Sequence, residues 1–239
     1  MDAKLHIITL LGFKGGAGRT TSAAALAYGL ASLGYHVALI DAGHAVPLQE
    51  RVLSESRGRG APPEESLLFK WADCLPPDAI LDGHNQYIRA TTTAYLGAVI
   101  DQLRLEGWDY AIIDTPAHQT AAVFEAAGQS SLLIVPARTS SDAIVVREAL
   151  PAEFMDRHHT LRCLVAGTDR PSDVRNAFAP LTVLRTELPH DTASTSVVPI
   201  SASSGEWQIC CSRLAREVAE LAAPREQINF PTQVGLFAT

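Results

Sequence analysis

The chain has no long apolar segment. No run in it approaches the roughly 18 consecutive apolar residues of a membrane-spanning helix. The N-terminal MDAKLHIITLL is short and has no cleavage-like site, which predicts a first strand rather than a signal peptide. The C-terminal PREQINFPTQVGLFAT has two prolines and few charges, unlike a basic amphipathic membrane helix. We therefore expect a cytoplasmic protein with no membrane anchor.

Cysteine pairs with metal-ligand spacing are also missing. None of the four cysteines forms a CxxC pair, which argues against a zinc or iron–sulfur site. Cys74 and Cys163 stand alone, whereas Cys210 and Cys211 are adjacent on a predicted closing helix. One of these two is expected to pack in the core.

A strongly basic surface is absent as well. The net charge of −7 gives no overall attraction to nucleic acid. A local basic patch stays possible, because basic residues are frequent in the second half of the chain, namely Arg157, His158, His159, Arg162, Arg170, Arg175 and Arg185.

Apolar residues are abundant enough for a large core. They make up 47% of the 239 residues, and this length suits one α/β domain over 1–239. Apolar runs alternate with helical stretches, which predicts a doubly wound, mostly parallel sheet with helices on both faces. A short strand is predicted near 87–90. We predict an exposed loop at 54–66, where charge, glycine and proline combine, and a C-terminal tail at 224–239.

The most informative stretch is GFKGGAGRTT at residues 12–21. It connects an apolar strand to an alanine-rich helix predicted over 20–33. Its glycines let successive backbone N–H groups point at one anion, and Thr20 offers a hydroxyl to a phosphate-bound magnesium. An ordinary glycine-rich turn is the alternative. The stretch predicts a phosphate-binding loop formed by Lys14, Gly15, Gly16, Ala17, Gly18, Arg19, Thr20 and Thr21.

Two aspartates end further apolar runs. YHVALID ends in Asp41, and the run in WDYAIIDTPA ends in Asp114. Ligands of parallel sheets bind beyond the carboxyl ends of the strands, so one rim should gather both aspartates and the loop. We expect Asp114 to hold Mg²⁺ opposite Thr20, with a turn or helix-cap role as the alternative.

These motifs, in this order, resemble the ParA/MinD family of deviant Walker A ATPases. The standard phosphate loop has glycine where Phe13 stands and lysine where Arg19 stands, whereas the deviant form adds a lysine at the position of Lys14. The resemblance covers most of residues 4–150. It implies a P-loop nucleotide-binding fold, ATP and Mg²⁺ as cofactors, and an ATP-dependent homodimer in which Lys14 contacts the partner's nucleotide. Lys14 and Asp41 would be its catalytic residues.

The same resemblance implies a role in positioning cargo. Family members position plasmids, chromosomes or conjugation complexes, and FKGGAGRTT resembles the VirC-type conjugation branch as much as the plasmid partition branch. The expected function is to position or segregate DNA or a large assembly with a partner protein. Basic residues near the C-terminus bind DNA nonspecifically in some relatives, and the candidates here are Arg213, Arg216 and Arg225. Residues 168–171 and 188–190 lie about where the family closes over adenine.

Two departures from the family pattern bear on catalysis. Arg19 keeps a positive charge but carries it on a wider, planar group than lysine. In IDAGHAVPL, Gly43 replaces the second aspartate of the family's DxDPQ segment, which helps organise the attacking water. We therefore expect weak ATPase activity, and a non-hydrolysing, nucleotide-sensing scaffold is the alternative.

Other interpretations of the sequence stay open. His44 and His118 are candidates for a replacement base, although a solvent-facing loop histidine is the simpler interpretation of each. A metabolic kinase or an amidotransferase-like ligase on the same fold is a third functional class. No acceptor-substrate motif in the sequence supports it.

Overall fold

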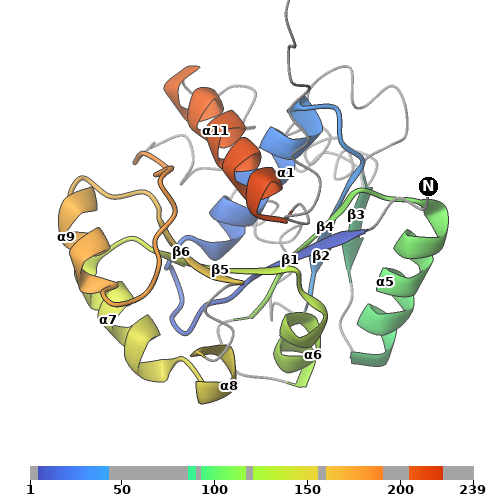
Figure 1. Cartoon of the computed structure of the whole chain (residues 1–239), viewed down its shortest axis with the longest axis horizontal. Helices are drawn as coiled ribbons and strands as arrows, with labels where there is room; N and C mark the ends of the chain where they lie inside the picture. The colour runs from blue at the N-terminus through green and yellow to red at the C-terminus, as the bar shows by residue number, and fades with distance from the viewer. Residues whose placement is uncertain are drawn as a thin grey trace, which may run out of the picture.

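Among the residues that the structure describes, the centre of the fold is a parallel sheet of six strands in the order β3-β2-β4-β1-β5-β6 (Figure 1). The computed structural model describes residues 5–42, 86–89, 93–116, 121–155, 160–190 and 205–222. Every strand pair is parallel. The strands are β1 (His6–Leu10), β2 (Val37–Asp41), β3 (Gln86–Arg89), β4 (Tyr110–Asp114), β5 (Leu132–Ala137) and β6 (Leu161–Val165).

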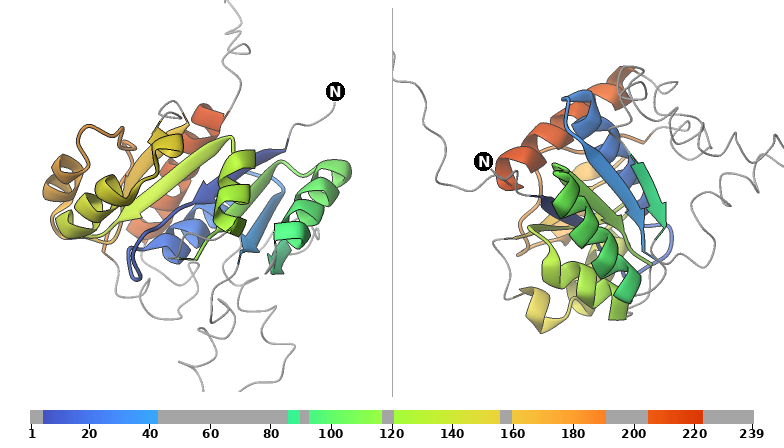
Figure 2. Two further views of the ribbon diagram at one scale, coloured as in Figure 1. Left: turned by 90° about the horizontal axis from the view of Figure 1, so that it is seen from below. Right: turned by 90° about the vertical axis from the view of Figure 1, so that its right-hand side faces the viewer.

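Helices cover both faces of this sheet, as the sequence predicts. Figure 2 shows α1 and α11 on one side of the sheet and α5 and α6 on the other. Three further helices, α7, α8 and α9, lie toward the β5–β6 edge (Figure 1). The helices are α1 (Arg19–Ser32), α5 (Thr93–Glu106), α6 (Ala121–Gln129), α7 (Ser140–Ala149), α8 (Ala152–Met155), α9 (Pro171–Ala177) and α11 (Gly205–Ala222).

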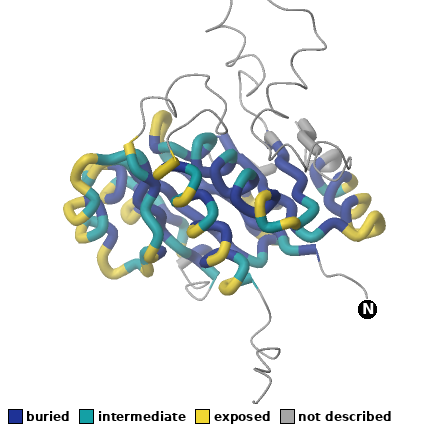
Figure 3. The backbone as a smooth tube through the Cα atoms, turned by 90° about the horizontal axis from the view of Figure 1, so that it is seen from above, coloured by how far each residue is buried: buried dark blue, intermediate teal, exposed yellow. Residues whose placement is uncertain are grey.

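Burial on both faces explains the continuous apolar runs in the sequence. Successive residues of a strand point to opposite faces. Ile8 therefore packs in the core under α1 and α11, whereas Ile7 packs in the core under α5. Every residue of β4 and β5 is buried. Figure 3 shows this buried centre inside a partly exposed layer.

Close packing of α11 on α1 completes one face. A Cβ atom at Gly29 of α1 would clash with the carbonyl oxygen of Cys211 and lie 2.9 Å from the Cβ of Ala215. Cys211 is buried and Cys210 only partly so, as the sequence predicts for one of the two. Burial raises the pKa of both Cys210 and Cys211. It also raises the pKa of Cys163 to about 12, which makes the Cys163 thiol unreactive.

Several sequence predictions lie outside the described residues. These are the loop at 54–66, the tail at 224–239, and the local structure around Gly43, His44, Cys74 and His118. The predicted strand near 87–90 is β3. Of the helices that the structure describes, none is both long and apolar enough to cross a membrane.

Candidate functional site

Three strands bring the predicted site residues to one rim of the sheet. In the strand register, Asp41 of β2 lies beside Asp114 of β4, and Asp114 lies beside Leu10 of β1. The glycine-rich loop follows β1 directly and leads into α1. The two aspartates and the loop are therefore neighbours, although they are far apart in the sequence. The side chain of Asp41 is not among the described parts.

The loop leaves the start of α1 open to an anion. Gly16 and Gly18 have φ angles of 81° and 90°, which side chains rarely allow. Gly18 caps α1 without any side-chain hydrogen bond, and the first turn has no acidic residue. The first N–H groups of α1 and the positive end of its dipole therefore suit a phosphate group.

Thr20 and Asp114 meet at the foot of this loop. The Thr20 hydroxyl donates a hydrogen bond of 2.7 Å to Asp114 Oδ2, and Asp114 is only 2% exposed. A hydroxyl and a carboxylate supply the hard oxygen atoms that Mg²⁺ prefers. No group of three His, Cys, Asp or Glu side chains that could hold a metal occurs among the described residues. Thr20 and Asp114 would therefore be able to supply oxygen ligands to a magnesium ion.

Arg19 contacts the backbone just after β1. Its side chain is buried, and Nη1 donates a hydrogen bond of 3.3 Å to the carbonyl oxygen of Gly12. A Cβ atom at Gly12 would lie 2.5 Å from Arg19 Cδ and 2.8 Å from Nη1. The Arg19 side chain therefore fills the space that a side chain at position 12 would need, and glycine at this position avoids the clash.

Lys14 is held by a carboxylate that sequence reasoning missed. Its Nζ lies 2.6 Å from Asp142 Oδ1; the lysine side chain is 50% exposed and the aspartate is buried. Asp142 also forms a capping box with Thr139 at the start of α7. Burial disfavours ionisation of Asp142, but the hydrogen bonds from Lys14 and Thr139 outweigh it and lower the pKa. The capping-box spacing could have located the helix start, but not the contact with Lys14.

A cavity of about 410 Å³ opens beside the loop. Arg138 lies on its wall, and Arg138 Nε donates a hydrogen bond of 3.3 Å to the carbonyl oxygen of Gly167. Arg138 also lines the space beside Gly18, where a Cβ atom would lie 3.5 Å from its Cγ. The described lining residues are Lys14, Gly15, Gly16, Arg138, Thr139, Asp142, Gly167, Thr168, Asp169 and His190.

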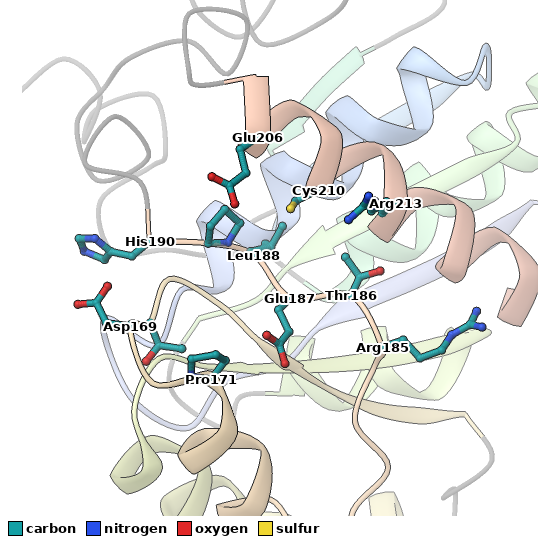
Figure 4. Close-up of a pocket in the computed structure, with 12 residues that line it drawn as sticks. Asp169, Pro171, Arg185, Thr186, Glu187, Leu188, His190, Glu206, Cys210 and Arg213 are labelled. Atoms are coloured by element: carbon teal, nitrogen blue, oxygen red, sulfur yellow. The ribbon is translucent and has the colours of Figure 1, made fainter.

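Figure 4 shows a second cavity, of about 610 Å³. The two cavities share Thr168, Asp169 and His190, which belong to the two segments where the sequence predicts adenine contacts. Cys210 and Arg213 project from α11 on the other side. The volume of this larger cavity is typical of small-molecule sites.

The predicted DNA-binding arginines do not all lie in the same environment. Arg213 and Arg216 are exposed on α11, and Arg213 lines the larger cavity. Arg225 lies outside the described residues, as do three members of the predicted basic patch at 157–159. Arg175 and Arg185 of that patch form ion pairs with glutamates. The described part of the patch is therefore partly neutralised.

The sequence of the chain is similar to those of known proteins. A family model described as the CobQ/CobB/MinD/ParA nucleotide binding domain matches residues 8–224. Protein VirC1 of Rhizobium radiobacter is 28% identical over 55% of the chain. The maintenance of carboxysome distribution protein A of Synechococcus elongatus is 26% identical over 57% of it. The matched segments span 48% and 60% of these two relatives.

Solved structures share the fold at lower sequence identity. The MinC:MinD cell division complex of Aquifex aeolicus contains a chain with a TM-score of 0.64 and 17% identity, with 92% of this chain and 98% of that chain covered. A plasmid partition protein of Borrelia burgdorferi bound to AMPPNP gives a TM-score of 0.62 at 17% identity, with 91% and 99% covered.

Proposed function

Because this chain belongs to the CobQ/CobB/MinD/ParA family of nucleotide-binding domains, we propose that it binds ATP with Mg²⁺ and positions DNA or a large assembly. The observation that carries the ATP site is the pair of Thr20 and Asp114, 2.7 Å apart beneath an uncapped helix start. Magnesium, when bound, would neutralise phosphate charge. Lys14, Arg138 and the loop N–H groups would hold the phosphates, and the larger cavity would take the nucleoside.

The proposed ATP site is tested by calorimetry with ATP and Mg²⁺. We expect the wild-type protein to bind ATP, and Thr20→Ala to lower its affinity at least tenfold in Mg²⁺ but less in EDTA. Thr182→Ala, at an exposed position away from both cavities, is the control. Failure of the wild-type protein to bind ATP would contradict the proposal.

A homodimer is the second part of the proposal. Lys14 is half exposed at the mouth of the smaller cavity, so a partner's phosphate could compete with Asp142 for its ammonium group. Binding in this way would make dimerisation depend on nucleotide. Asp41, at the end of β2 beside Asp114, would contribute to the catalytic step together with Lys14.

Weak hydrolysis is the third part. Arg19 Nη1 donates a hydrogen bond to the carbonyl oxygen of Gly12, so the guanidinium contacts the backbone just after β1 in this structure. This observation also favours the alternative, a nucleotide-sensing scaffold that does not hydrolyse ATP. Steady-state phosphate release distinguishes the two, because turnover above background without any partner supports the ATPase.

The cargo is proposed from the relatives. One is named for carboxysome distribution, one for plasmid partition and one for cell division. Similarity to VirC1 also agrees with the conjugation branch proposed from the loop. We expect an unidentified partner protein and nonspecific DNA contacts from Arg213, Arg216 and Arg225, in the cytoplasm. Such DNA binding should fall steeply with salt, which a fluorescence anisotropy titration measures.

A further inference from the structure

A buried carboxylate on α11 holds one wall of the larger cavity. The side chain of Glu217 is 8% exposed. It accepts hydrogen bonds from the backbone N–H groups of Arg185, at 2.7 Å, and Thr186, at 2.8 Å. Burial opposes its ionisation, but these N–H groups outweigh burial and lower the pKa of Glu217. The carboxylate is therefore charged near neutral pH and bound to the main chain of another segment.

Helix α9 also contacts the segment that Glu217 binds, which comprises residues 184–188. Arg175 donates to Glu187 Oε1 through Nε, at 3.1 Å, and through Nη2, at 2.6 Å. Its Nη1 donates to the carbonyl oxygen of Leu184 at 3.0 Å. The backbone N–H of Leu188 donates to the carbonyl oxygen of Val165 in β6. Residues 184–188 are thus fixed by α9, α11 and the sheet together.

Four residues of this segment line the larger cavity. Arg185, Thr186, Glu187 and Leu188 form a continuous wall of the larger cavity (Figure 4). The described lining of the smaller cavity, where the loop residues lie, includes none of them. The Leu188 carbonyl oxygen also accepts a hydrogen bond of 2.8 Å from the N–H of Gly167, which lines the smaller cavity. A change in the position of residues 185–187 would therefore act mainly on the nucleoside end of the proposed site.

We propose that Glu217 is a positioning residue that sets the shape of the nucleoside cavity from α11, an inference that rests on the proposed nucleotide binding. A carboxylate can accept from both N–H groups, whereas an amide at the same position would turn its own donor toward one of them. Glu217→Gln should therefore loosen the wall without removing the volume of the side chain.

The test compares ATP with inorganic tripolyphosphate, which has no nucleoside. We expect Glu217→Gln to weaken ATP binding about tenfold, because ATP would have to reorder the loosened wall when it binds. Tripolyphosphate, measured by displacement of a fluorescent ATP analogue, should bind the variant within twofold of wild type. Glu220→Gln is the matched control. Glu220 is exposed and accepts a hydrogen bond from the Arg185 side chain, whereas Glu217 also accepts from the Arg185 backbone N–H.

Arg175→Lys provides an independent variant should Glu217→Gln fold poorly. It should also weaken ATP binding and spare tripolyphosphate, because lysine cannot hold Glu187 and the Leu184 carbonyl together. Equal loss of both ligands in the folded variants, or no loss of ATP binding, would overturn the inference. A wild-type protein that binds neither ligand would instead overturn the proposed function on which the inference rests.

Discussion

At the scale of residues, some contacts of the site were predictable from the sequence and others were not. The proximity of Thr20 and Asp114 was predictable, because Thr20 lies in the glycine-rich loop and Asp114 ends an apolar strand at the same rim of the sheet. Asp142 and Glu217 were not predictable. Asp142 meets a lysine 128 positions away, and Glu217 binds backbone groups rather than a side chain with a recognisable pattern. Contacts of this kind depend on the packing of helices that lie far apart in the chain.

Arg19 gives a prediction about catalysis. Arg19→Lys removes the planar group that contacts the Gly12 carbonyl oxygen, and it supplies the lysine that the family uses. We expect the ATP turnover of the variant to exceed that of wild type by about tenfold, which corresponds to a barrier lower by about 1.4 kcal/mol. Phosphate release at saturating ATP measures it. A fall in turnover would contradict this prediction, because it would show that Arg19 supports ATP hydrolysis better than lysine does.

Asp142 gives a prediction about pH. Its pKa is lower in the folded protein than the usual value of 3.8, so its ion pair stabilises the fold above that value. This stabilisation disappears as the pH falls through the lowered pKa. We expect Asp142→Asn to lower the unfolding free energy by about 1 kcal/mol at pH 7. The difference between variant and wild type should shrink below about pH 4.

Denaturant titrations at several pH values check the Asp142 prediction. Asp101→Asn is the control, because Asp101 forms an exposed ion pair with Arg104 within one helix. Its effect on stability should be small at every pH. A difference between Asp142→Asn and wild type that persists unchanged at acid pH would contradict the account of this ion pair.

At the scale of elements, the sequence predicted the sheet and its helices but not how closely two helices approach. Continuous apolar runs predicted parallel strands buried on both faces, and β4 and β5 confirm this. The predicted helix over 20–33 is α1, from Arg19 to Ser32. The contact of α1 with α11 was not predictable, since it depends on Gly29 lying against the backbone of Cys211.

Gly29→Ala tests this contact between helices. The added methyl group would clash with the Cys211 carbonyl oxygen, so α11 must shift. Overpacking of this kind costs about 1–3 kcal/mol, even though alanine is the better helix former. Gly97→Ala in α5 is the control, because open space surrounds it and alanine should stabilise that helix. Thermal unfolding should show opposite shifts; a stabilised Gly29→Ala would contradict the packing.

At the scale of the whole molecule, the family was predictable and the complete site was not. The predicted ParA/MinD membership is confirmed by a family match over residues 8–224. The two cavities, however, are built from the loop after β1, the segment after β5, the residues after β6 and α11. Their walls exist only when the chain is folded, so sequence motifs indicated the glycine-rich loop more clearly than the larger cavity.

The molecule's central proposed property is dimerisation controlled by nucleotide through Lys14. Lys14 is half exposed and bound to Asp142, so it is placed to exchange that carboxylate for phosphate. Light scattering of the purified protein, alone and with ATP and Mg²⁺, measures the molar mass directly. We expect ATP to double the mass of wild type and to leave Lys14→Ala monomeric. A wild-type mass unchanged by saturating ATP, or a Lys14→Ala variant that still doubles, would contradict the account.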